Sequence, residues 1–414
     1  MDKSKCWPAR ESFFYGWVIV AAAFAISAVA SGVTYAFPVF FDTLASSFGR
    51  NRAEISLIFS ICIFVWFSTG LCAGILADKF GPRIVALLGC MFMASGLAIA
   101  GSSSSIYELY GAYGAGVGLG GGLMYIPAVS IVQRWFKRKR ALASGLAVCG
   151  TGFGALVFPP IASTLTGDIG WRLTHYVFSA TVIMVCGGAS LAFVAHPSDI
   201  GQQPDGNGVT PQHIVESTSS GLTLREALAT RSFWQLYLAS LLSSAAVYIT
   251  YVHLVPYSRD RGVSPDASVA LISVLGVSSV CGRFLVGGLA DRIGRLGALS
   301  LMFSGLSLTM IWWLMIPPSS MTLLIYAIAF GTLSGGYISI LPALTMELFG
   351  GQRVASVIGS LYTSWGIGAL CGPTFAGVVF DLRHSYFYAI LCGAVAMALS
   401  AVSCSTIRSP ESPY

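Results

Sequence analysis

The feature that most constrains this chain is a series of apolar runs, each about 20 residues long, that together fill most of its length. A helix of that length crosses the hydrocarbon core of a bilayer. Alternating segments of about ten residues, which are typical of membrane β-barrels, do not occur in the sequence. Composition agrees, because 55% of the residues are hydrophobic and only 10% are charged. Since so few charges cannot cover a water-soluble surface, we expect lipid to cover much of it.

Twelve such runs predict an all-α membrane protein with twelve transmembrane helices in two pseudo-symmetric six-helix bundles. We expect an N-terminal bundle over 1–195, a cytoplasmic linker over 196–231 and a C-terminal bundle over 232–414. The runs lie near 15–41, 54–77, 84–101, 107–133, 141–166, 173–195, 232–257, 267–290, 297–316, 321–346, 354–380 and 385–407.

One polar stretch, rich in proline, glycine and serine, separates the sixth run from the seventh. Residues 196–221 have the composition of a flexible linker. The following residues, Leu222 to Ala229, predict a short amphipathic helix on the membrane surface. The first apolar run carries no clear cleavage signal, so we interpret it as the first spanning helix and not as a removed signal peptide.

The basic residues predict the orientation of the chain in the membrane. Sixteen Lys and Arg residues fall on one side of the twelve runs and six on the other, while Arg283 belongs to neither set. Basic residues concentrate on the cytoplasmic side, so we expect both termini and the linker there, in a plasma or bacterial inner membrane. A net charge of +6 that is distributed in this way does not indicate a nucleic-acid partner.

Signatures of enzymes and metal proteins do not occur in the sequence. The ten cysteines form no CxxC or Cys/His spacing, and no cluster of nucleophile and base is found, so we expect no metal, no cofactor and no enzymatic activity. The segment Gly116-Val-Gly118-Leu-Gly-Gly121 matches a dinucleotide-binding pattern. It lies inside an apolar run with no strand before it, so we expect its glycines to serve close helix packing.

Two motifs repeat at the same place in each half of the chain. The first follows the second and the eighth run with the same spacing of Gly, Asp and Gly, 213 residues apart. The second opens the fifth helix of each half with an arginine and a small-residue segment. Contacts of such loops can hold one conformation and break in another, so we predict a conformational motif. Its members are Gly74, Asp78, Arg83, Gly287, Asp291, Arg292 and Arg140.

Parallel repeats joined by a cytoplasmic linker resemble the major facilitator superfamily. The segment from Arg134 to Gly154, RWFKRKRALASGLAVCGTGFG, closely resembles the fourth–fifth loop signature of the monocarboxylate transporter family. Phe13-Phe-Tyr-Gly-Trp17-Val resembles that family's first-helix signature, without its acidic residue and second glycine. Oxalate/formate antiporters share much of this pattern. The resemblance implies the major-facilitator fold and proton-coupled symport, or anion exchange, of small carboxylates.

Arg283 is the main candidate for the substrate-binding cation. It precedes Asp291, at the inner end of its helix, by eight residues, so it lies roughly 12 Å inside the membrane at ~1.5 Å per residue. A buried guanidinium stays charged, and its fork matches a carboxylate. A snorkelling arginine or a pair with a buried acid is the alternative. The membrane-embedded part of its own helix carries no acid.

Comparison with the two related families leaves the coupling mechanism open. Both have an arginine matching Arg283. Monocarboxylate transporters commonly add an acid one turn earlier and a first-helix lysine, where this chain has Ser279 and Val39. The relay is therefore incomplete. Oxalate/formate antiporters have a buried lysine in the eleventh helix, at the place of Trp365. One buried cation favours a monoanion, because a dianion needs two.

Further residues could complete a substrate site or carry the coupling proton. Histidine titrates near neutrality, and a phenol can donate to a carboxylate while it presents an apolar face. The alternative for each aromatic residue is packing, and for each acid a solvated or capping role. The substrate-binding candidates are Tyr35, Phe37, Tyr125, His253, Tyr337 and Trp365, and the proton-coupling candidates are Asp42, Glu108 and His253.

Together these features predict a secondary active transporter of small monocarboxylates such as lactate and pyruvate. We expect proton symport with alternating access, and carboxylate exchange is the alternative. The expected partners are the monocarboxylate, a proton and membrane lipid. We expect a monomer, with or without an accessory membrane subunit.

Overall fold

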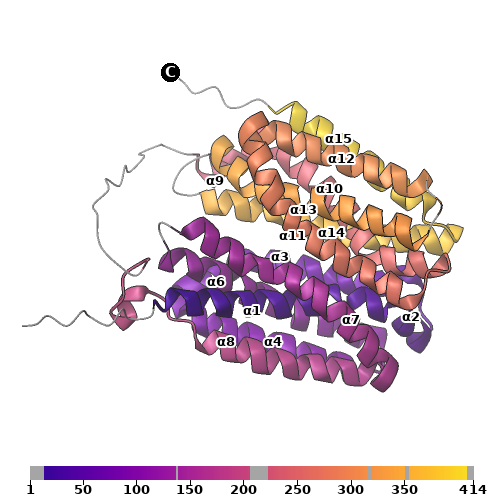
Figure 1. The fold of residues 1–414 in the computed structure, drawn as a ribbon, viewed down its shortest axis with the longest axis horizontal. Helices are drawn as coiled ribbons and strands as arrows, with labels where there is room; N and C mark the ends of the chain where they lie inside the picture. The colour runs from indigo at the N-terminus through magenta and orange to yellow at the C-terminus, as the bar shows by residue number, and fades with distance from the viewer. Residues whose placement is uncertain are drawn as a thin grey trace, which may run out of the picture.

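The computed structural model describes residues 14–136, 139–205, 222–315, 317, 319–349 and 354–407. Helices account for nearly all of these residues, and none of them lies in a strand. Helices α1 to α8 lie together on one side of the molecule, and helices α10 to α15 lie together on the other (Figure 1). The long helices run roughly along the long axis of the view. The all-α fold class predicted from the sequence is therefore confirmed.

The N-terminal helices are long and apolar, with two short π-helical segments, η1 and η2, inside them. Their bounds are α1 Gly16–Tyr35, α2 Phe37–Phe48, α3 Arg52–Phe80, α4 Pro82–Ser102, α5 Ile106–Gly111, η1 Ala112–Gly118, α6 Leu119–Trp135, α7 Arg140–Thr181, η2 Val182–Gly187 and α8 Gly188–Leu191.

The C-terminal helices follow a short 3₁₀ turn, η3, and a five-residue helix, α9. Their bounds are η3 Pro197–Ile200, α9 Leu224–Leu228, α10 Arg231–Asp260, α11 Pro265–Ile293, α12 Arg295–Met315, α13 Ser320–Phe349, α14 Val354–Arg383 and α15 Phe387–Ser405.

The described residues contain eleven helical stretches long and apolar enough to cross a membrane, and one of these holds two passes. That stretch, Leu142–Leu191, has 50 residues, about 75 Å of helix at ~1.5 Å per residue, against a hydrocarbon core of about 30 Å. Gly170 divides it, with φ 81° and ψ 160°, a conformation that glycine adopts readily. The described residues thus contain the twelve passes that the sequence predicts.

The first pass differs from the single helix expected over 15–41. Helix α1 ends at Tyr35, and α2 continues from Phe37 to Phe48. Pro38, in the first turn of α2, has no N–H to donate to the preceding turn, so the helix breaks at Ala36. The second segment also extends beyond the expected end of the run at residue 41, to Phe48, where Gly49 caps it with φ 60°.

Close packing explains the glycines of the false dinucleotide-binding pattern, as expected. A Cβ on Gly120 would lie 2.6 Å from the carbonyl oxygen of Gly89, and one on Gly96 would lie 2.6 Å from the Cα of Gly116. Only glycines allow α4 to approach η1 and α6 so closely.

The short helix expected after the linker is present at Leu224–Leu228. Thr223 caps it, because its hydroxyl accepts from the amide of Glu226 and the Glu226 carboxylate accepts from the amide of Thr223. The amide of Leu222 donates to the carbonyl of Phe349, 2.9 Å away, which ties this segment to the end of α13. Residues 206–221 of the expected linker lie outside the described residues, and the boundaries of the two halves stay a prediction.

The two groups of helices meet along α3 with α14, α7 with α11, and α2 with α10. Following the predicted orientation, we call the end with the α2–α3 and α10–α11 turns the outer end, and the opposite end the inner end. At the outer end a Cβ on Gly377 would lie 2.6 Å from the Cα of Ala53. Among the described atoms, a Cβ on Gly145, nearer the inner end, would meet only Phe284, at 3.8 Å, and one on Gly74 would meet nothing within 4 Å. The two groups are therefore in closer contact at Gly377 than at these two positions nearer the inner end.

Candidate functional site

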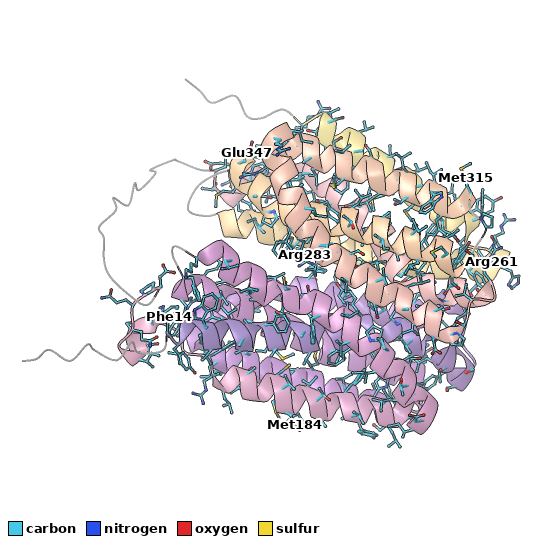
Figure 2. All side chains as sticks on the ribbon, in the orientation of Figure 1. Phe14, Met184, Arg261, Arg283, Met315 and Glu347 are labelled. Carbon is cyan, nitrogen blue, oxygen red and sulfur yellow. The ribbon has the colours of Figure 1, made fainter. Side chains whose placement is uncertain are left out.

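Arg283 lies deep in the bundle, between the two groups of helices. It is ten residues from the inner end of α11 at Ile293, about 15 Å along the helix at ~1.5 Å per residue. Figure 2 shows it where the two groups meet, between the labelled Glu347 toward one end and Arg261 toward the other. Its side chain is half-buried. The guanidinium is therefore far from either end of the bundle.

The hydrogen-bonding capacity of Arg283 is largely unused. One terminal nitrogen donates to the hydroxyl of Thr151, on α7, over a long 3.5 Å. The Nε atom is buried and has no partner among the described residues. No ion pair joins Arg283 to a carboxylate in the described part of the chain. Because guanidinium stays charged, the site offers directed donors and a positive charge to an anion.

Four phenols surround this charge closely enough to interact with it electrostatically. They are Tyr35 of α1, Tyr125 of α6, Tyr251 of α10 and Tyr362 of α14. The rings of Tyr35 and Tyr251 stack, with centroids 5.2 Å apart and planes at 26°. Each phenol can donate to a carboxylate, and each ring can cover its carbon chain. The structure thus brings Arg283 together with two predicted residues, Tyr35 and Tyr125.

Sequence reasoning did not single out the other neighbours of Arg283. Tyr251 comes two residues before His253, Tyr362 comes three residues before Trp365, and Thr151 lies inside the fourth–fifth loop signature. The sequence feature that could have identified them is a polar group within a spanning helix, close to a residue or motif that was already singled out.

Tyr337 and Trp365, two more predicted residues, form the next layer of the site. The ring of Trp365 lies 5.0 Å from that of Tyr362, 5.8 Å from that of Tyr337 and 5.6 Å from that of Phe67. Tyr337 also packs against Phe303, at 5.2 Å. Aromatic side chains from both halves therefore meet beside Tyr362.

Phe37 and Glu108 are not brought to Arg283. Phe37 is fully buried against Phe59 and Tyr113, with ring centroids 5.7 and 5.4 Å away. Glu108 is exposed in the first turn of α5, where its carboxylate accepts from the amide of Ser104 at 2.8 Å. The first has the contacts of a core residue and the second those of a helix cap.

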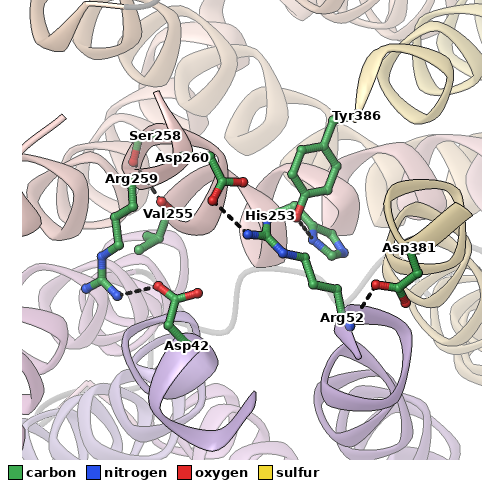
Figure 3. A network of polar contacts seen from close by, with 9 residues as sticks. All are labelled: Asp42, Arg52, His253, Val255, Ser258, Arg259, Asp260, Asp381 and Tyr386. Atoms are coloured by element: carbon green, nitrogen blue, oxygen red, sulfur yellow. Dashed lines mark hydrogen bonds and ion pairs between the residues drawn. The ribbon is translucent and has the colours of Figure 1, made fainter. Parts of the chain in front are cut away.

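The remaining two candidates, Asp42 and His253, belong to a second group of residues at the outer end, which we call the outer contact. Two ion pairs cross between the halves here: Asp42 with Arg259 at 2.9 Å and Arg52 with Asp260 at 2.7 Å (Figure 3). Arg52 also donates to the hydroxyl of Tyr386, 2.6 Å away. Charges from α2 and α3 thus bind the outer end of α10.

Asp381 adds a bond between helix ends to the outer contact. Its carboxylate, near the end of α14, accepts from the backbone amides of Arg52 and Ala53 at 3.0 and 2.9 Å. These are free N–H groups in the first turn of α3, where the helix dipole also favours a negative charge. The neighbouring ring of Phe380 lies 3.9 Å from the Arg52 guanidinium carbon.

His253 lies buried in the outer contact and bonds to both halves. Its Nε2 atom is 2.9 Å from the carbonyl oxygen of Pro373 and 3.1 Å from the hydroxyl of Ser56, and its Nδ1 atom is 3.0 Å from that of Tyr386. A carbonyl only accepts, so the network assigns the proton to Nε2 and makes Nδ1 the acceptor. A neutral imidazole satisfies all these bonds. Further in, Thr374 donates to Ser60 at 3.2 Å.

The predicted conformational motif is described only in part. Gly74 lies near the inner end of α3, Arg83 is exposed at the start of α4, and Arg292 is exposed at the end of α11. The side chains of Asp78, Arg140 and Asp291 and the surroundings of Gly287 lie outside what the structure describes. The role of the motif stays a prediction. Among the described residues, no group of three or more His, Cys, Asp or Glu could hold a metal ion.

The family model of the Major Facilitator Superfamily matches residues 22–330 of this chain. The chain is therefore a multi-pass membrane transporter of this superfamily. It is 29% identical to monocarboxylate transporter 13 of Rattus norvegicus over 94% of this chain and 88% of that protein. It is also 29% identical to monocarboxylate transporter 2 of Homo sapiens, over 93% of this chain and 84% of that protein. Both relatives are monocarboxylate transporters, the family whose fourth–fifth loop signature the segment from Arg134 to Gly154 resembles.

Solved structures share the fold. A bacterial homolog of the human lysosomal transporter Spinster, in an inward-facing and unoccupied conformation, matches with a TM-score of 0.77 and 18% identity. The match covers 97% of this chain and 100% of that one. The occupied inward-facing form of that homolog matches with a TM-score of 0.76 and 17% identity. The predicted major-facilitator fold is therefore confirmed.

Proposed function

We propose that this protein carries small monocarboxylates, such as lactate and pyruvate, across a cell membrane by proton symport with alternating access. The observation that carries the proposal is Arg283, a half-buried guanidinium with an unpartnered Nε and no acidic partner among the described residues. A single carboxylate balances one such charge. A dianion would leave a second negative charge without a counter-ion in a low-dielectric site.

The groups around Arg283 suit a short organic acid. Its carboxylate binds the guanidinium fork, and hydroxyls of the neighbouring tyrosines donate to its remaining lone pairs. The carbon end packs against the aromatic faces, including the stacked pair of Tyr35 and Tyr251. These groups come from both halves of the molecule, so relative movement of the halves would open or complete the site.

The outer contact supports alternating access. It joins the halves at one end of the bundle, while Gly74 and Gly145, nearer the other end, make no comparably close contact with described atoms. In the proposed cycle this is the state open to the cytoplasm, and the outer contact breaks when the site opens to the outside. Rocking of one half against the other then moves the substrate past Arg283.

The outer contact also bears on where the coupling proton travels. Protonation of Asp42 would remove its ion pair with Arg259, and protonation of His253 would remove the acceptor that Tyr386 needs. Either proton would oppose closure of the outer end, which the loaded transporter must achieve in inward symport. We therefore assign the coupling proton to the carboxylate site beside Arg283, and neither to these two residues nor to Glu108. A neutral loaded site also lowers the cost of closure.

Carboxylate exchange is the second candidate, and one observation favours it. No acid that could release a proton lies in an ion pair with Arg283 in the described part of the chain. In an exchanger, a second anion replaces the first without a proton. We propose further that the protein acts as a monomer in a plasma or inner membrane, with both termini in the cytoplasm.

Uptake of a substrate panel into proteoliposomes tests the proposal. The panel contains lactate, pyruvate, acetate, formate and oxalate at two external pH values, with protein-free liposomes as control. We expect lactate and pyruvate uptake to rise with an inward proton gradient, and oxalate to compete poorly. Trans-stimulation without pH dependence would assign exchange instead. No uptake of any member would refute carboxylate transport.

A further inference from the structure

Trp365 has a buried N–H group that binds nothing in the described part of the chain. Its side chain is only 6% exposed, and its Nε1 atom has no hydrogen-bond partner. Three other indoles do donate: Trp135 to the carbonyl of Val194, Trp171 to the hydroxyl of Ser47, and Trp234 to the carbonyl of Leu228, over 2.9, 3.1 and 2.9 Å. Nε1 of Trp313 also has no partner in the described part of the chain, but that indole packs against Tyr257 and Tyr326, which are not among the phenols that interact with Arg283. An unpaired buried donor is costly, so its retention calls for an explanation.

The indole lies beside the groups that face Arg283. Its closest ring neighbour is Tyr362, 5.0 Å away, which is within electrostatic reach of Arg283. Another ring neighbour, Tyr337, interacts electrostatically with Tyr35, which in turn interacts with Arg283. Two unpartnered buried donors, Nε of Arg283 on α11 and Nε1 of Trp365 on α14, therefore adjoin one aromatic cluster.

We infer that Trp365 is a specificity-determining residue, whose indole N–H donates to an oxygen on carbon 2 of the substrate. The inference rests on the proposed carboxylate transport, and it assigns to this one side chain the recognition of the substituent that distinguishes 2-oxo and 2-hydroxy monocarboxylates from unsubstituted acids. An indole N–H is neutral and only donates, so its complement is a neutral acceptor such as a keto or hydroxyl oxygen. The carboxylate is already matched by the guanidinium.

The indole N–H of Trp365 would distinguish substrates because it stays unpaired when the substrate has no oxygen on carbon 2. A substrate with an oxygen on carbon 2 gives the indole a partner, whereas propionate leaves it as it is in this structure. Sites built around a donor reject analogues that lack the matching acceptor more strongly than apolar pockets reject a missing methylene. A packing role alone would give no such selectivity.

The test compares wild type and Trp365→Phe, both full-length and in proteoliposomes, with radiolabelled lactate, pyruvate and propionate. The variant removes the N–H and keeps an aromatic ring. We expect its KM for lactate and pyruvate to rise about tenfold, as for one lost hydrogen bond, while that for propionate changes less than about twofold. The matched control, Tyr362→Phe, removes the neighbouring hydroxyl and should affect all three acids alike.

A second measurement needs no variant. In wild type, lactate should compete with labelled pyruvate better than 3-hydroxypropionate does, because that isomer carries its hydroxyl on carbon 3. The inference is overturned if wild type treats the two isomers alike, or if Trp365→Phe lowers lactate and propionate uptake equally. Those outcomes leave carboxylate transport standing. If wild type transports none of these acids, the proposed function fails, and this inference with it.

Discussion

The outer contact and the Arg283 site differ in how completely their charges are paired. At the outer end Arg52 has a carboxylate, a phenol and an aromatic ring, and Asp381 accepts from two backbone amides. In the centre Arg283 has one long hydrogen bond to Thr151, and its Nε has no hydrogen-bond partner among the described residues. Nε of Arg259 in the outer contact is also buried without a partner among the described residues, but its guanidinium is paired with the Asp42 carboxylate. The arginines of the outer contact are therefore paired with carboxylates without any ligand, whereas Arg283 has no carboxylate partner in the described part of the chain.

This difference separates the parts that hold a conformation from the part that binds. Paired groups at the outer end stabilise one arrangement of the halves and gain nothing from a substrate. An unpaired cation in the centre loses solvation without compensation until an anion arrives. A ligand shifts a conformational equilibrium only by binding one state better than another, so the centre must provide that preference.

The largest expected effect comes from substitution of the central arginine, Arg283. Arg283→Ala removes the charge, and Arg283→Lys keeps the charge but loses the fork. We expect either change to lower lactate uptake about 100-fold or more, since a charge-assisted bidentate contact disappears. Initial rates in proteoliposomes, normalised to inserted protein, measure this. Arg259→Lys, at the outer end, is the matched control and should stay within a few-fold of wild type. Normal uptake by Arg283→Ala would contradict the comparison.

The next largest effect on uptake should come from a reversible disulfide that holds the outer end closed. The γ-oxygens of Ser60 and Thr374 are 3.2 Å apart across α3 and α14, so Ser60→Cys with Thr374→Cys should form a disulfide. Oxidation should lower uptake about tenfold or more, because the outer end can no longer open, and a reductant should restore it. Each single variant is a control, since Cys62 and Cys371 lie close by in sequence. A cross-link verified by mass that leaves uptake intact would rule out alternating access through this contact.

Hydropathy and repeats were enough to predict the fold, and the reason is physical. A bilayer requires apolar helices of one length, so spans can be read directly from the sequence. The break at Ala36 was missed because a proline in the first turn of a helix and one that interrupts a longer helix have the same local sequence. Gly170 fell between two expected runs, so the bend there was anticipated as a loop.

The central site was predictable in kind, and the outer contact was not. Arg283 stands out because a charge within a span requires an explanation. Asp42 and Arg259 are 217 positions apart, and Arg52 and Asp260 are 208 apart. Each residue alone looks like a solvated charge at a helix end, and only the docking of the halves pairs them. His253 was a candidate for the substrate site because a sequence does not show which face of α10 meets Ser56. Only the docking of the halves places it in the outer contact.

A smaller effect should come from Asp381→Asn. The amide keeps one acceptor for the start of α3 but loses the charge that complements the helix dipole. We expect the population open to the outside to rise about fivefold, the equivalent of about 1 kcal/mol. A membrane-impermeant maleimide that labels Ser60→Cys from outside measures this population. Asp266→Asn is the control, because that carboxylate lies in the first turn of its own helix, α11. Equal labelling in both variants would assign Asp381 no part in closure.

The smallest expected effect comes from Asp42→Asn and compares the two ion pairs of the outer contact with each other. The side chains of Asp42 and Arg259 are 43% and 22% exposed, against 36% and 17% for Asp260 and Arg52. Exposed pairs contribute about 0.2–1 kcal/mol, and a middle value of about 0.6 kcal/mol corresponds to about a threefold change, so Asp42→Asn should raise outside labelling about threefold, and less at high salt. A double-mutant cycle with Arg259→Gln isolates the pair. A coupling larger than that of Arg52 with Asp260 would reverse the ranking, and it would mean that the exposed edge, not the helix-end contact around Arg52, holds the outer end closed.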